Sequence, residues 1–160
     1  MPVPFSLVLA KLAVLAATTA GQPADSERQD APASLHGDRL PVLDAEQFAR
    51  LRATMSEAAF CYFIYCHLLD VEFHLEEIAR ARAAGDLPRL SHKAMTVAGM
   101  AADVGAMRVD AAARRLGAAC RTGHYPETCR FIGELGERCT ESEMELRRFL
   151  AYRAQAAGVA

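Results

Sequence analysis

Apolar residues recur at every third or fourth position over most of the chain after residue 42, and this spacing predicts five helices. The most sustained stripe belongs to a long helix over 56–84 and consists of Phe60, Ile64, Leu68, Val71, Leu75 and Ile78. Shorter stripes predict helices over 44–55, 87–104, 106–120 and 126–152. No segment shows the strict alternation of apolar and polar residues that a half-buried strand requires.

Residues that end one helix and begin the next stand between the predicted elements. Asp44 is placed to cap the first helix, and Gly85 followed by Asp86 ends the second and caps the third. Gly105 ends the third helix, and Gly123 follows the fourth. Because these turns are short, consecutive helices must run antiparallel. The sequence therefore predicts an all-α fold, an up-down-up-down four-helix bundle with an additional short N-terminal helix.

The chain divides into an N-terminal part, residues 1–41, and the predicted bundle, residues 42–156. Residues 1–20 are apolar and end in small residues, as a signal peptide does, but no basic side chain precedes the apolar run and Lys11 interrupts it. The stretch is also a poor membrane span. Residues 21–41 are rich in Pro, Asp, Ser and Gly, which is typical of a flexible linker.

These features favour a cytoplasmic protein with a dispensable N-terminal segment over an exported one. Cleavage after Ala20 would support export. A true start near Met55 or in the linker would support the cytoplasm.

Composition excludes some classes of function. The formal net charge is -2, so no basic excess indicates nucleic acid binding. The five cysteines are odd in number and contain no C-x-x-C pair, which indicates small buried apolar residues in a reducing compartment rather than a disulfide framework or a zinc site. No motif calls for a cofactor.

The third and fourth predicted helices resemble the histidine phosphotransfer (HPt) family. That family has A-H-x-L-K-G, five residues and then G-A, followed by a stretch near L-x-x-x-A-x-x-L-E-x-A-A-R-x-G. This chain has Ala94-Met95-Thr96-Val97-Ala98-Gly99, five residues and then Gly105-Ala106. Matching residues follow at the family spacing: Val109, Ala113, Leu116, Ala119, Arg121 and Gly123. The resemblance spans roughly residues 43–149, with its specific part in 85–123, and it implies the HPt four-helix bundle.

Counting from either end of this match, the family's phosphoacceptor histidine corresponds to Met95 and its lysine to Ala98. Phosphotransfer needs an imidazole nitrogen as nucleophile, and a thioether cannot replace it. Gly99 retains the family glycine, which allows a partner to approach the helix closely. The resemblance therefore implies a degenerate HPt domain.

Such a domain would dock a response-regulator receiver domain or a histidine kinase without carrying phosphate, and it would not be an enzyme. The expected docking residues are His92, Met95, Ala98, Gly99 and Met100. By resemblance we expect a monomer.

Three alternatives remain open. His92 lies one helical turn before Met95, so with Lys93 it would form a displaced phosphoacceptor site. An exported helical bundle of unknown binding function is the second. The third is a metal site on one face of the second helix formed by His67, Asp70 and His74, for which the sequence supplies no further ligand.

Overall fold

A computed structural model describes residues 39–156 of the chain, and all regular structure in this range is helical. The elements are α2 (Ala45–Ala53), α3 (Glu57–Ala83), α4 (Leu87–Val104), α5 (Met107–Thr122) and α6 (Tyr125–Ala156). The predicted fold class is confirmed, and α4 has the bounds that the sequence pattern gave. The last helix begins one residue earlier than expected and continues four residues beyond Tyr152.

The helix ends follow the capping residues seen in the sequence. The Asp44 carboxylate accepts hydrogen bonds from the backbone N–H groups of Glu46 and Gln47, both at 3.0 Å. Asp86 accepts one from the N–H of Arg89 at 2.9 Å. Gly105 ends α4 with a left-handed φ of 75°, a conformation that a residue with a side chain rarely adopts.

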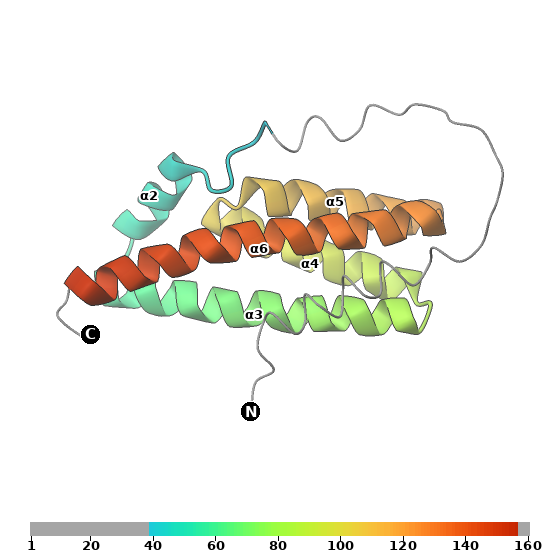
Figure 1. Ribbon diagram of the computed structural model, residues 1–160, viewed down its shortest axis with the longest axis horizontal. Helices are drawn as coiled ribbons and strands as arrows, with labels where there is room; N and C mark the ends of the chain where they lie inside the picture. Colours follow the sequence, from blue (N-terminus) through green and yellow to red (C-terminus); the bar gives the residue numbers. More distant parts are fainter. Residues whose placement is uncertain (1–38, 157–160) are drawn as a thin grey trace.

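The four long helices enclose one apolar core, with α4 packed between α3 and α5, and α5 packed against α6 (Figure 1). The largest fully buried side chains come from all four helices: Phe60, Ile64, Leu75, Ile78, Leu90, Val97, Leu116, Ile132, Leu135 and Leu146. Each contributes roughly 1.5–3 kcal/mol relative to leaving it in water. Because α4 has neighbours on two sides, its remaining side faces solvent.

Helix α2 is the predicted additional helix, and it lies at the end of the bundle where α3 begins and α6 ends (Figure 1). Three phenylalanine rings meet there edge to face: Phe48 of α2, Phe60 of α3 and Phe149 of α6, with centroids 5.1–5.5 Å apart. The Asp44 N–H donates to the Gly105 carbonyl at 2.8 Å, which ties α2 to the end of α4.

The acidic and basic residues of α6 pair along the helix and also with residues of α5. Arg138 pairs with Glu141 at 2.7 Å, three residues along the helix. Glu141 also pairs with Arg108 of α5 at 3.2 Å, and Glu134 pairs with Arg115 of α5. The charged residues therefore join α5 to α6 as well, which spacing along one helix does not reveal.

The N-terminal segment and most of the linker lie outside the described residues, so the division at residue 41 stays a prediction. No helix between residues 39 and 156 is both long enough and apolar enough to cross a membrane.

Candidate functional site: the outer ridge of α4

The middle of α4 presents an outward ridge formed by His92, Met95 and Gly99, and each of these residues is exposed. Their spacing of three and four residues places them on one side of the helix. The opposite side of α4 carries Leu90, Ala94 and Val97, which are fully buried in the core. Met95 therefore faces outward, and 37% of it is exposed.

The side chain of Met95 leans toward α5 and covers Gly117. A Cβ atom placed on Gly117 would lie 3.1 Å from the Met95 sulfur and 3.4 Å from its Cγ. The Ser91 hydroxyl donates to the Gly117 carbonyl at 3.2 Å and holds the same two helices together. Leu116 matches the second L of the family stretch, so Gly117 occupies the position of the family glutamate. The chain thus departs from the family pattern at the residue that faces Met95.

Ala98 does not belong to the ridge. Its exposed fraction is 0%, and it lies within the apolar core cluster. The expectation that Ala98 contacts a partner is therefore wrong, because its side chain has no accessible surface. Met100 is half-buried and packs against the same core. Gly99 has open space in front of it, with no atom within 4 Å of an added Cβ, so the helix backbone is accessible there.

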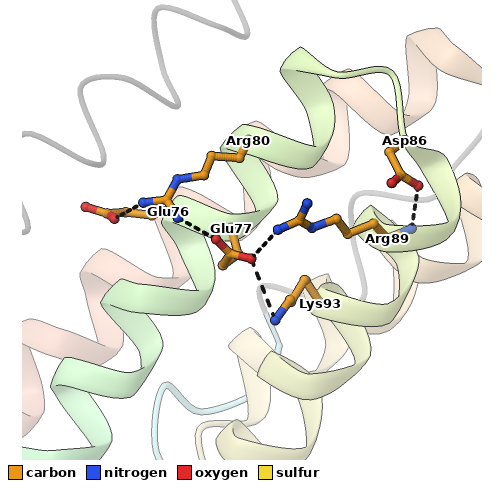
Figure 2. A network of polar contacts seen from close by, with 6 residues as sticks. All are labelled: Glu76, Glu77, Arg80, Asp86, Arg89 and Lys93. Atoms are coloured by element: carbon orange, nitrogen blue, oxygen red, sulfur yellow. Dashed lines mark hydrogen bonds and ion pairs between the residues drawn. The ribbon is translucent and has the colours of Figure 1, made fainter.

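Helices α3 and α4 are joined beside the ridge by a network of ion pairs around Glu77. Figure 2 shows the Glu77 carboxylate between Arg80 of its own helix and Arg89 and Lys93 of α4. The distances are 2.6 Å to Arg80, 2.7 Å to Arg89 and 3.9 Å to Lys93. The hydrogen bond from Arg89 is the main reason that the pKa of Glu77 is lowered. The carboxylate therefore stays ionised and fixes both helices.

Lys93 is drawn toward α3 by this network. Its ammonium group lies 5.8 Å from the ring centroid of Phe73, within cation–π range. Close by, burial lowers the pKa of His74, and the charges of Lys93 and His92 act in the same direction. His92 itself is exposed, and its backbone carbonyl accepts a hydrogen bond from the Thr96 hydroxyl at 3.1 Å. The lysine that follows His92 is thus held by α3 instead of standing free beside the imidazole.

The three residues of the alternative metal site, His67, Asp70 and His74, lie at different depths on α3. His67 is buried and lines a small internal cavity with Ser142 and Glu143, whereas Asp70 is exposed. Burial lowers the pKa of His67, and the nearby Asp70 and Asp103 oppose that effect. In the described part of the chain, no three His, Cys, Asp or Glu side chains come together as metal ligands.

All five cysteines are free thiols. Cys139 is buried deeply enough to raise its pKa to about 12. A thiol in that environment is chemically inert, which agrees with the expected packing role.

The outer face of α3 carries exposed apolar residues that the sequence analysis did not single out. Tyr62, Tyr65, Leu69 and Phe73 are 41–70% exposed, and they follow one another at intervals of three or four residues. The signal was present in the sequence, since α3 has a second apolar stripe besides the one that forms the core. Phe73 brings this face next to Lys93 and therefore next to the α4 ridge.

The fold is similar to that of a solved structure. The chain superposes on the crystal structure of histidine-containing phosphotransfer protein B (HptB) from Pseudomonas aeruginosa PAO1 with a TM-score of 0.67. The match covers 70% of this chain and 96% of that one, at 22% sequence identity. The fold is that of an HPt protein. No family model matches the sequence, and no curated protein matches it either. The HPt-like fold therefore rests on architecture and on the motif around α4.

Proposed function

We propose that this chain is a signalling module of the two-component or phosphorelay type that docks a receiver domain or a histidine kinase through the α4 ridge. In this proposal His92, Met95 and Gly99 contact the partner, with the half-buried Met100 at the edge. The module carries no phosphoryl group itself and is not an enzyme. The observation that carries the proposal is the position of Met95, exposed at mid-helix where the HPt pattern has its histidine.

The chemistry of the ridge supports docking without transfer. A phosphoryl acceptor needs a nitrogen lone pair on the exposed surface, and the Met95 thioether does not form a stable bond to phosphorus. The position of the family lysine is filled by a buried alanine, so no cation stands one turn along from residue 95. A flexible, polarisable methionine beside a bare glycine backbone still offers an adaptable apolar contact.

The direct test combines binding with phosphate labelling. The full-length chain is incubated with a panel of receiver domains phosphorylated on aspartate, and acid-labile phosphate on the chain is measured after separation. We expect binding to at least one receiver and no labelling. Labelling of the wild-type chain at any residue, His92 included, or binding to none of the receivers and kinases tried, would contradict the docking proposal.

Met95→His gives the complementary experiment. If the scaffold docks receivers in the HPt manner, the restored imidazole takes the phosphoryl group from the aspartyl phosphate, and the aspartate carboxylate is released. We expect labelling of Met95→His and none of Met144→His, which places an imidazole at an even more exposed position on α6. The contrast separates a docked reaction from chance phosphorylation of an exposed histidine.

A second candidate function keeps phosphotransfer and uses His92 as the acceptor. The observation that favours it is an exposed imidazole on the same side of α4, one turn from Met95. His92→Gln should then abolish the labelling of the wild-type chain while the helical circular dichroism signal stays unchanged. The engagement of Lys93 with Glu77 and Phe73 favours the first candidate, because it removes the cation that this site would use.

The proposal includes a cytoplasmic location and a monomeric state for the chain. A relay partner acts in the cytoplasm as a monomer, so we expect the chain isolated from its own cells not to be cleaved after Ala20 and to sediment as a single copy. A mature chain that begins after Ala20 would instead support the exported bundle.

A further inference from the structure

The outer face of α3 is apolar on a helix whose inner face is already buried. Tyr62, Tyr65, Leu69 and Phe73 cover this face over about three turns, and each is at least 41% exposed. A helix that is apolar on both sides is normally covered on both sides. Near its N-terminal end lies a groove between α3 and the end of α6, lined by Ala58, Cys61 and Leu150 and by the ion pair of Glu57 with Arg153. The surface therefore has room for an elongated apolar occupant.

The size of the face argues against a second copy of the chain as that occupant. Fully buried aromatic side chains cover about 150–250 Å² each, so the exposed parts of three aromatic rings and one leucine amount to roughly 400 Å². Two copies face to face would bury roughly 800 Å² in total, less than the about 1,200–2,000 Å² of a stable interface. A segment of the same chain needs no such area, because its tether supplies an effective concentration in the millimolar range.

The N-terminal segment has the matching chemistry. Its apolar residues include Phe5, Val8, Leu12 and Leu15, which follow one another at intervals of three or four residues. Lys11 is the one charged side chain among the first twenty residues. On α3 the apolar face is flanked by the Asp70 carboxylate and by Glu76, which is paired with Arg80. The Lys93 ammonium lies beside Phe73 at one end of the same face. The charges at its edge are therefore mixed, and the match between the face and the segment is apolar.

The linker is long enough to join the two. Residues 21–38 separate the segment from the described part of the chain. A flexible linker of that length has a root-mean-square reach of roughly 25 Å. This is comparable with the width of a helical bundle. We propose that residues 1–20 lie along the outer face of α3 and cover Tyr62, Tyr65, Leu69 and Phe73. The inference is independent of the signalling function proposed above.

The chain offers a sharp test, because it contains only two lysines, Lys11 and Lys93. Lys93 lies beside Phe73 at one end of the α3 face. The purified full-length protein is treated with the amine-reactive cross-linker disuccinimidyl suberate, and the monomer band is digested and analysed by mass spectrometry. We expect a peptide pair joined through Lys11 and Lys93 within one chain. Mixing chains with and without heavy isotopes shows whether the joined lysines belong to the same molecule.

Two matched variants decide whether the α3 face is responsible. Leu69→Asp places a charge in the middle of the face and should lower the yield of the cross-link at least several-fold. Met144→Asp places the same charge at an exposed apolar residue on α6 and should leave the yield unchanged. Circular dichroism confirms that both variants keep the helical fold, and Tyr65→Asp replaces Leu69→Asp if that variant unfolds.

Three outcomes would overturn the proposal. Joined lysines found only between different chains would show that a second copy covers the face. An absent cross-link, or one that Leu69→Asp does not reduce, would show that residues 1–20 do not bind there. A chain isolated from its own cells without residues 1–20 would leave no such segment to bind.

Discussion

The sulfur of Met95 on α4 rests against the backbone of Gly117 on α5, so closely that an added Cβ would lie 3.1 Å from it. Replacement of Gly117 by alanine therefore tests whether Met95 is movable. Alanine favours an α-helix over glycine by about 1 kcal/mol, and the thioether is a flexible group that can shift outward. We expect Gly117→Ala to raise the free energy of unfolding by up to about 1 kcal/mol in urea denaturation. A loss of stability would show that Met95 is held rigidly.

Gly99→Ala is the matched change on the open side of the same ridge. An added Cβ there meets no atom within 4 Å, so the helix should gain roughly the same 0.5–1 kcal/mol of stability. The methyl group would, however, stand between α4 and a docked partner. We expect stronger resistance to urea together with weaker binding to the receiver domain. Unchanged binding would show that the partner does not approach Gly99.

Ala98→Lys would restore the lysine of the HPt pattern, and the structure predicts that the chain resists it. Ala98 is completely buried, so the longer side chain must push neighbouring helices apart or bend out to solvent. Overpacking of this kind costs about 1–3 kcal/mol, and a buried ammonium adds to that cost. Met95→His, at an exposed position, should change stability by less than about 1 kcal/mol. Equal stability of the two variants would contradict the buried position of Ala98.

The Glu77 network predicts a loss of stability in acid. The pKa of Glu77 is lowered in the folded chain, mainly by the Arg89 hydrogen bond. The folded state therefore binds the proton less readily than the unfolded state does. Its stabilising contribution is complete above the ordinary carboxylate pKa of 4.5 and is lost as pH falls through the lowered value. Glu77→Gln should lower stability at pH 7 and flatten the dependence below pH 4.5, measured by thermal unfolding across pH.

Because His67 is buried, we expect the stability of the fold to fall with pH in a second range, above the range of Glu77. Burial lowers the pKa of this imidazole, although the carboxylates of Asp70 and Asp103 oppose the effect. The unfolded chain therefore takes up a proton first, and stability falls as pH drops below the ordinary value of 6.5. Urea denaturation between pH 7.5 and 5.5 should show this slope, and His67→Phe should reduce it. The pKa of His74 is lowered in the same direction, so His74→Gln measures its share.

Sequence periodicity predicted the architecture well because α2, α3 and α4 each begin at a capping side chain. Asp44, Asp86 and Gly105 mark the bounds of α2 and α4, and all three occupy the expected positions. The exposed position of Met95 agrees with the HPt resemblance, which implied a docking role for this residue. Relations between helices were harder to foresee. The burial of Ala98 depends on how closely α3, α4 and α5 approach one another, which spacing within α4 does not encode.

The same limit explains what the sequence left unseen at the site. The contact of Gly117 with Met95 depends on the packing of α5 against α4, which the sequence of either helix does not reveal. Glu77 looked like one more surface carboxylate, and only the pairing of α3 with α4 brings it between Arg89 and Lys93. Helix α3 carries apolar residues on two faces, and the sequence does not say which face is buried. The exposed fractions of the side chains distinguish the outer face from the core.

The hydrogen bonds between α2 and α4 determine where the bundle can be shortened. Two carbonyl oxygens at the end of α4 receive a further hydrogen bond from the segment around α2, Ala102 from the Gln47 side chain and Gly105 from the Asp44 N–H. A polypeptide that starts at Met55 would leave both oxygens without these donors. It would also lack Phe48, so that Phe60 and Phe149 would lose their contacts with that ring. We therefore expect the smallest fragment that folds stably to include Asp44. Helix α2 covers the end of the bundle where α3 begins and α6 ends.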